Sequence, residues 1–103
     1  MNDTIAATAL AALGHEARLK VFRLLVRAGK DGLNIGDIGR LLGMPPSTLA
    51  HHITTLVQSG LLTQERRGRE VINRADFDAM ESVLTYVDEE CCAGVASTAA
   101  DVA

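Results

Sequence analysis

Residues 34–62, NIGDIGRLLGMPPSTLAHHITTLVQSGLL, constrain the fold more than any other stretch of this chain. The first part predicts a short amphipathic helix, because apolar side chains recur there at steps of three and four. These side chains are Ile35, Ile38, Leu41 and Leu42. Gly43 then ends the helix, since glycine readily adopts the left-handed conformation just past a helix C-terminus. The pair Pro45-Pro46 can start a new helix but cannot continue the old one, so we expect two helices joined by a tight turn.

The second of these helices has an outer face that suits the reading of DNA. Its apolar side chains recur at helical spacing on the inner face and are Leu49, Ile53, Leu56 and Val57. The outer face carries small or hydrogen-bonding side chains and no carboxylate: Ser47, Thr48, Ala50, His51, Thr54, Thr55 and Gln58. Base edges in the major groove offer donors, acceptors and methyl groups, whereas phosphates repel anions. The pattern therefore predicts a helix-turn-helix, and the alternative is a helical hairpin that only fills a core.

An arginine-rich hairpin is expected directly after the helix-turn-helix. Residues 61–66 and 69–74 have the composition of two short strands with a glycine turn between them. The arginines at its tip are Arg66, Arg67 and Arg69. A hairpin in this position is a wing, whose tip can reach phosphates or the minor groove. In the alternative interpretation it is a solvated charged turn in which Glu65 and Glu70 pair with the arginines.

Two helices are expected before residue 34. Asn2 or Asp3 can cap the first, whose stripe of small apolar side chains would allow close packing, including against another subunit. This stripe is Ile5, Ala9 and Ala12, with Leu10 and Leu13 beside it. The second helix opens near His15, which we interpret as a structural or surface residue and not as a metal ligand. Its expected buried residues are Leu19, Phe22, Leu25 and Val26, and its expected exposed residues are Arg18, Lys20, Arg23 and Arg27. Residues 33–35 are expected to pair briefly as an edge strand.

A last helix is expected to follow a cap at Asp76. Its apolar residues alternate at steps of three and four and form a heptad seam: Phe77, Met80, Leu84, Val87 and Cys91. In a monomer this seam would leave apolar surface exposed, so we expect it to pack against the first helix and against a partner subunit.

The expected fold is mostly α-helical with a small β-hairpin wing. It is a winged helix-turn-helix, dimeric through the first and last helices. The DNA-binding and dimerisation domain spans residues 1–93, and residues 94–103, which lack an apolar period, are expected to be a disordered tail. A chain of 103 residues fits one such domain.

Composition excludes several classes of protein. No apolar run approaches the roughly 18 residues of a membrane span. The only cysteines are the adjacent pair Cys91-Cys92, which is no framework for a secreted disulfide fold, so we expect a cytoplasmic protein. A phosphate-binding glycine loop and a nucleophile with a nearby base are both missing from the sequence, so we do not expect an enzyme. Its three aromatic residues, Phe22, Phe77 and Tyr86, are too few for stacking single-stranded bases.

The net charge of −3 hides an uneven distribution. Residues 1–75 contain all ten Lys and Arg residues with six carboxylates, whereas residues 76–103 contain seven carboxylates and no basic residue. Since like charges repel, the acidic end is expected to face away from a polyanion. A merely solvated acidic helix would have the same composition.

The order of elements and three sequence phrases resemble the ArsR/SmtB family of bacterial transcriptional regulators. The phrases are ALGHEARLKVFRLL, IGDIGRLLGMPPSTLAHHITTLVQSGLL and RRGREVIN. The resemblance covers residues 5–92 and implies a dimeric winged-helix repressor that binds double-stranded operator DNA and releases it when an inducer binds. It places base reading at Ser47, Thr48, Ala50, His51 and Thr54, and the wing at Arg66, Arg67 and Arg69. Ala50 departs from the serine common in the family, and His52 of the double histidine is expected to pack or cap.

The resemblance leaves one site for an inducer. Residues 34–37 lack the cysteines of the family's arsenic sensors, and residues 77–90 lack the histidines of its zinc sensors. Cys91 and Cys92 remain, and a subset of the family carries such a pair as a thiophilic site for trivalent arsenic. Trivalent arsenic or antimony prefers soft thiolates. This chain supplies two per subunit, so a third ligand would come from a small thiol, the partner subunit or a carboxylate of Glu89 or Glu90.

The geometry of a regular helix argues against this site. Adjacent residues point about 100° apart, so both sulfurs can reach one atom only if the helix unwinds near Gly94. Cys91 also continues the apolar seam, and a buried structural cysteine is the alternative.

The sequence therefore favours a repressor induced through Cys91 and Cys92, with no cofactor required. The alternatives are a winged-helix regulator with redox sensing or no thiol sensing, and a protein-interaction module without an operator.

Overall fold

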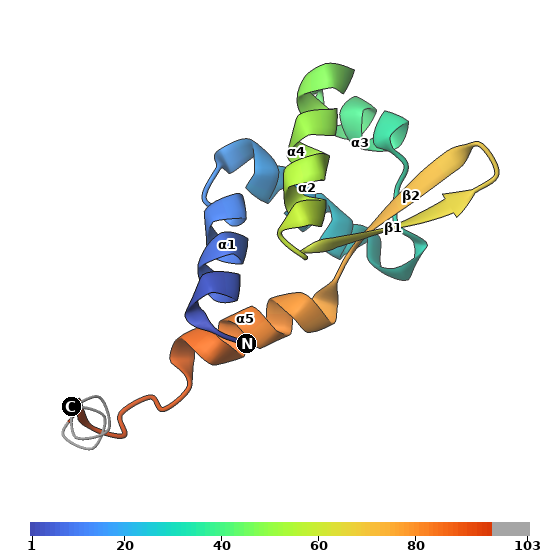
Figure 1. Ribbon diagram of the computed structural model, residues 1–103. Helices are drawn as coiled ribbons and strands as arrows, with labels where there is room; N and C mark the ends of the chain where they lie inside the picture. Colours follow the sequence, from blue (N-terminus) through green and yellow to red (C-terminus); the bar gives the residue numbers. More distant parts are fainter. Residues whose placement is uncertain (96–103) are drawn as a thin grey trace.

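The computed structural model describes residues 1–95 and confirms a mostly helical fold with one β-hairpin (Figure 1). The elements, in chain order, are α1 (Asp3–Leu13), α2 (Glu16–Ala28), a 3₁₀ turn η1 (Gly29–Asp31), α3 (Ile35–Leu42), α4 (Pro46–Gln58), β1 (Leu62–Arg67), β2 (Glu70–Ala75) and α5 (Phe77–Asp88). Among residues 1–95, no helix is long and apolar enough to cross a membrane.

Helix ends follow short-range sequence signals. The side chains of Asn2, His15, Asn34 and Asp76 cap α1, α2, α3 and α5, each accepting a hydrogen bond from a backbone N–H of the first turn. Gly43 lies in the left-handed region, with φ 67° and ψ 31°, and ends α3 as expected. Pro46 is the first residue of α4. The turn between α3 and α4 is therefore specified by residues within it.

The core lies between α1, α2, α4 and the base of the hairpin. Leu25, Leu49 and Leu56 are fully buried there, and Ile38 joins them from α3. Within the described part of the chain, the last helix contributes only Val83 to the buried set. A hydrogen bond links α1 and α2, in which Arg18 Nε donates to the backbone oxygen of Ala12 at 2.7 Å.

Two residues expected to be buried, Leu19 and Val26, are exposed in the protomer. Three members of the predicted apolar stripes are exposed as well: Ile5, Ile35 and Leu41, of which Ile5 is 50% exposed. The buried positions are Ala6, Ala9 and Ala12 in α1, and Val21, Phe22 and Leu25 in α2. A periodic pattern defines an apolar stripe but does not say which edge of the stripe a neighbouring element covers. The exposed residues therefore lie at the uncovered edges of their stripes.

The seam expected along the last helix is mostly exposed in the protomer, but it ends earlier than predicted. Leu84 and Val87 are 56% and 59% exposed, and α5 ends at Asp88, so Cys91 does not continue the helix. The last turn of α5 has no basic residue, and the acidic residues that follow would lie against the negative end of the helix dipole. The exposed apolar surface expected of a monomer is present. Of the expected tail 94–103, residues 96–103 lie outside the described residues.

The hairpin pairs in antiparallel register from Leu62 opposite Ala75 to Arg67 opposite Glu70. The connecting turn contains Gly68, whose φ of 59° favours glycine. In place of the edge strand expected at residues 33–35, the structure has a single β-bridge, between Leu33 and Asn73. The hairpin projects away from the helices beyond this bridge (Figure 1).

Candidate nucleic-acid interface

The outer face of α4 is presented to solvent as the sequence predicts. Leu49, Ile53 and Leu56 anchor the helix in the core. The candidate base-reading residues Ser47, Thr48, Ala50, His51 and Thr54 are all exposed. The Thr54 hydroxyl donates to the backbone oxygen of Ala50 at 2.9 Å, so towards solvent it offers a methyl group and an acceptor. The face therefore combines acceptor, methyl and imidazole groups without a negative charge.

The two adjacent histidines of α4 have different surroundings. His51 is exposed, whereas His52 is only 6% exposed, which agrees with its expected packing role. The ring of His52 lies 4.9 Å from that of His15 between centroids, and among residues 1–95 its Nδ1 has no hydrogen-bond partner. His15 uses its own Nδ1 to accept from the N–H of Ala17 at 3.2 Å. The sequence marks both histidines as structural but does not show that they meet.

Burial lowers the pKa of His52, and the nearby His15, Arg18 and His51 lower it further. The folded protein therefore keeps this imidazole neutral below its ordinary pKa of 6.5. As pH falls through that value, the unfolded state takes up the proton first, and stability decreases until the folded pKa is reached.

We expect His52→Gln to reduce this loss of stability on acidification. The measurement is the change in thermal midpoint between about pH 7.5 and about pH 5.5. His51→Gln, at the exposed neighbour, is the control and should keep most of the wild-type pH dependence, because burial is the largest cause of the lowered pKa of His52 and His51 the smallest. Equal pH dependence in His52→Gln and wild type would contradict this assignment.

The wing arginines lie at the exposed end of the hairpin. Arg66 and Arg69 have no ion pair among the described residues, while Arg67 Nε lies 3.5 Å from Glu65 Oε1. The interpretation as a charged turn therefore holds only for Arg67. Glu70 instead accepts from Asn34 Nδ2 at 2.8 Å. Within residues 1–95, two of the three arginines are thus free to meet phosphates.

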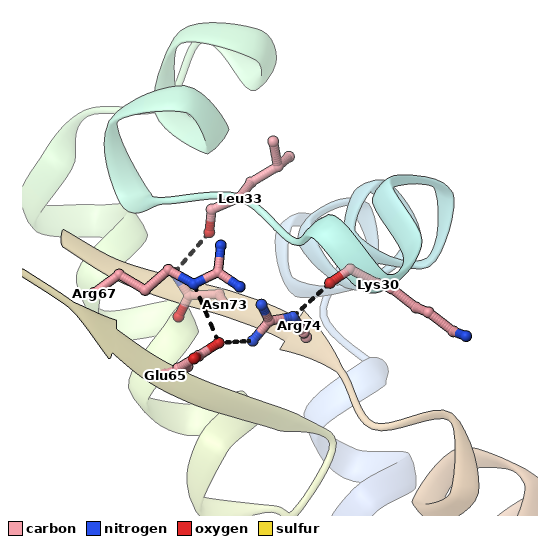
Figure 2. A network of polar contacts seen from close by, with 6 residues as sticks. All are labelled: Lys30, Leu33, Glu65, Arg67, Asn73 and Arg74. Carbon is pink, nitrogen blue, oxygen red and sulfur yellow. Dashed lines mark hydrogen bonds and ion pairs between the residues drawn. The ribbon is translucent and has the colours of Figure 1, made fainter.

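Glu65 lies on β1 between two arginines of the hairpin, Arg67 and Arg74 (Figure 2). Its Oε1 also accepts from Arg74 Nη1 at 2.7 Å. The hydrogen bond from Arg74, and next the charge of Arg67, lower the pKa of the Glu65 carboxyl. Arg74 was not singled out from the sequence, because its partners lie nine and forty-four residues away.

The wing and α4 border one surface groove. It is lined by Asn34, Ile35, Gly36, Ile53, Gln64, Arg69, Glu70, Val71 and Asn73. Ile53 belongs to the inner face of α4 and Arg69 to the hairpin turn, so the groove lies between the base of α4 and the wing. Arg69 and Glu70 are the charged residues of its lining, and the candidate base-reading residues of α4 do not line it.

The cysteine pair lies beyond the end of α5. The two side chains are therefore not forced apart as adjacent residues on a regular helix would be. The sulfurs of Cys91 and Cys92 are exposed and 3.1 Å apart. Cys92 has φ 66°, and the N–H of Cys91 donates to the oxygen of Asp88 at 3.1 Å, so the backbone turns and brings both thiols together. The hydrogen bond with Cys92, and then desolvation, raise the pKa of the Cys91 thiol.

A third ligand is not placed beside the pair within the described part of the protomer. Among residues 1–95, no group of three His, Cys, Asp or Glu side chains is placed to hold a metal ion. The arrangement supplies two adjacent thiols that one thiophilic atom can bridge.

Comparison with known proteins gives the family. Residues 13–65 match a family model described as a helix-turn-helix domain. The chain is 32% identical over 68 residues, covering 66% of this chain and 67% of the relative, to the uncharacterised helix-turn-helix-type transcriptional regulator YceK of Bacillus subtilis (strain 168). It is 33% identical over 60 residues, covering 58% of this chain and 46% of the relative, to a protein of Halobacterium salinarum (strain ATCC 700922) named putative arsenical resistance operon repressor ArsR.

A solved structure shares the fold over nearly the whole chain. It is the solution structure of the homodimeric winged helix-turn-helix DNA-binding domain of Mb0332 from Mycobacterium bovis, described as a possible ArsR-family transcriptional regulator. The TM-score is 0.68 at 20% identity, covering 91% of this chain and 94% of the other. This family and this fold are those of DNA-binding transcriptional regulators, not of enzymes. The chain therefore belongs to the helix-turn-helix domain family and has the winged helix-turn-helix fold.

Proposed function

We propose that this protein is a repressor that binds operator DNA as a homodimer and releases it when a thiophilic metalloid binds Cys91 and Cys92. The observation that carries the DNA-binding part is the exposed, carboxylate-free face of α4 beside the exposed arginines of the wing. Side chains of α4 would read base edges in the major groove, and the wing would contact phosphates or the minor groove.

The exposed apolar surface of α1 and α5 supports the homodimer. Ile5 and Leu10 of α1, and Leu84 and Val87 of α5, are exposed in the protomer. Leu10 and Val87 line the same surface groove between these helices. Covering this surface with a second copy would bury it and would set two recognition helices against two half-sites, about 34 Å or one DNA turn apart.

The converging thiols support the inducer site. Trivalent arsenic would replace the two thiol protons and bond both sulfurs, with a third ligand from outside the pair or with a methyl group already on the metalloid. The name of the Halobacterium relative as an arsenical resistance operon repressor favours arsenic over other thiophilic elements. The pair follows Val87 by only a few residues, so ligation would act next to the proposed dimer surface.

The test is a mobility-shift assay with DNA from upstream of the protein's own gene, alone and with arsenite or monomethylarsenite. We expect a shift with this DNA that either arsenical reverses, and Cys91→Ser or Cys92→Ser should bind DNA but no longer release it. Release of both variants at the wild-type arsenical concentration would contradict the thiol site. Release by hydrogen peroxide but by neither arsenical would instead support redox sensing at the same pair.

A further inference from the structure

Arg74 joins the base of the wing to two segments that are distant in sequence (Figure 2). Its Nε donates to the backbone oxygen of Lys30 at 2.6 Å, and its Nη1 donates to Glu65 Oε1 at 2.7 Å. One guanidinium group therefore bridges strand β1 and the turn before α3. Arg74 itself lies on β2, so the same residue connects both strands of the hairpin to the helical body.

Asn73 completes this junction from the buried side. It is 1% exposed, and its backbone N–H and oxygen pair with the oxygen and N–H of Leu33 at 2.8 and 3.0 Å. Its Nδ2 donates to the same Leu33 oxygen at 3.2 Å, and its Oδ1 accepts from Gln64 Nε2 at 2.8 Å. The side chain thus satisfies its hydrogen bonds while linking the segment before α3 to both strands.

Gly32 shows how closely the two segments approach. A Cβ atom at this position would lie 2.5 Å from the Asn73 oxygen and 2.8 Å from Arg74 Cγ, and the backbone has φ 62°. Only glycine fits both the conformation and the contact. The segment before α3 therefore packs directly against β2, at the point where Asn73 and Arg74 hydrogen-bond to it.

The wing beyond this junction is a two-stranded hairpin that extends into solvent. The strand residues Arg66 and Arg67 are exposed, and a two-stranded hairpin on its own is at best marginally stable in water. The direction of the tip therefore depends on this junction and on one hydrogen bond closer to the tip, which Asn34 Nδ2 donates to Glu70.

We propose that Arg74 is a positioning residue for DNA binding, which holds the wing at a fixed place relative to α4 so that the tip arginines meet phosphates. The proposal rests on the proposed DNA-binding function. Arg74 would not itself contact DNA. Its role depends on the forked guanidinium, which can bond the Lys30 oxygen and the Glu65 carboxylate at the same time.

Arg74→Lys tests this role, because lysine keeps the charge but cannot make both hydrogen bonds in the same geometry. We expect faster amide hydrogen exchange in β1 and β2 of the free protein. We also expect operator affinity about tenfold lower and a salt dependence shallower by roughly 0.9 for each phosphate that the displaced wing no longer reaches. Arg23→Lys, at an exposed position on α2, is the matched control and should leave both measurements unchanged.

The outcomes separate this proposal from the proposed function. Wild-type exchange in the wing of Arg74→Lys, or a wild-type salt slope despite faster exchange, overturns the positioning role. If Arg74→Lys does not fold, Glu65→Gln removes the charged partner of Arg74 and must give the faster exchange in the wing. Its salt slope is not a test, because Glu65 also pairs with Arg67. A wild-type protein that binds no DNA contradicts the proposed function, and hydrogen exchange then still decides whether Arg74 holds the wing.

Discussion

Replacing the three tip arginines with alanine, Arg66→Ala, Arg67→Ala and Arg69→Ala together, is expected to abolish operator binding at physiological salt. The dimer would lose six positive charges from the surface that we propose meets phosphates. Each phosphate interaction that is removed makes the negative slope of log K against log salt shallower by about 0.9, so the slope should become shallower by up to about 5. Fluorescence anisotropy at several salt concentrations measures both affinity and slope.

A matched variant controls for total charge. Lys20, Arg23 and Arg27 lie on α2, and changing these three to alanine removes as many positive charges without touching the wing. This variant should retain its operator affinity within a few-fold. A protein-interaction module without an operator would instead show no sequence-specific binding in wild type, and the wing variant would change little.

The second large effect is expected at the proposed dimer surface. Leu84→Glu together with Val87→Glu would place carboxylates on apolar surface that we propose the partner subunit covers, and an uncompensated buried charge opposes association. We expect a monomer by sedimentation or light scattering. Linking two binding modules raises avidity about 100- to 10,000-fold, so the operator affinity should decrease by a comparable factor.

The control for this variant is Leu41→Glu, at another exposed apolar residue, on α3 and away from the groove between α1 and α5. It should remain a dimer. A double variant of Leu84 and Val87 that is still dimeric would show that α5 does not form the subunit contact.

Most of the elements could be predicted because their signals are local. The cap at Asn34 starts α3, and the left-handed Gly43 and the following Pro46 lie at the turn that they specify. The outer face of α4 was predictable for the same reason, since a strong amphipathic period leaves only one face for the core. The hairpin needed only two short strands and a glycine turn.

The same periodicity gave wrong burial for Leu19 and Val26 of α2. An apolar stripe is visible in the sequence, but the element that covers it is not. In α5 the core takes Val83, which lies beside the expected seam. Met80 of the seam packs against the core, whereas Leu84 and Val87 are exposed. Local spacing cannot distinguish the core from a surface that a second subunit would cover.

For the cysteine pair, the sequence pattern argued against a shared ligand, whereas the structure brings the two sulfurs together. Extending the heptad put Cys91 on the helix, and regular helix geometry then kept its sulfur away from that of Cys92. The structure ends α5 at Asp88 and turns the backbone, and the two sulfurs come within 3.1 Å. A change of only a few residues in the helix end thus turns an unfavourable pair into a candidate ligand site.

The sequence alone determined the helix-turn-helix, the wing and the face of α4, because caps, turns and periodicity act over a few residues. Only the tertiary structure decided that His15 meets His52, and that Arg74 holds Lys30 and Glu65. These contacts join residues between nine and forty-four positions apart, and their formation depends on how the packed core places whole elements. No short-range pattern encodes that placement, so the parts of the candidate DNA surface were predictable and the junction that orients its wing was not.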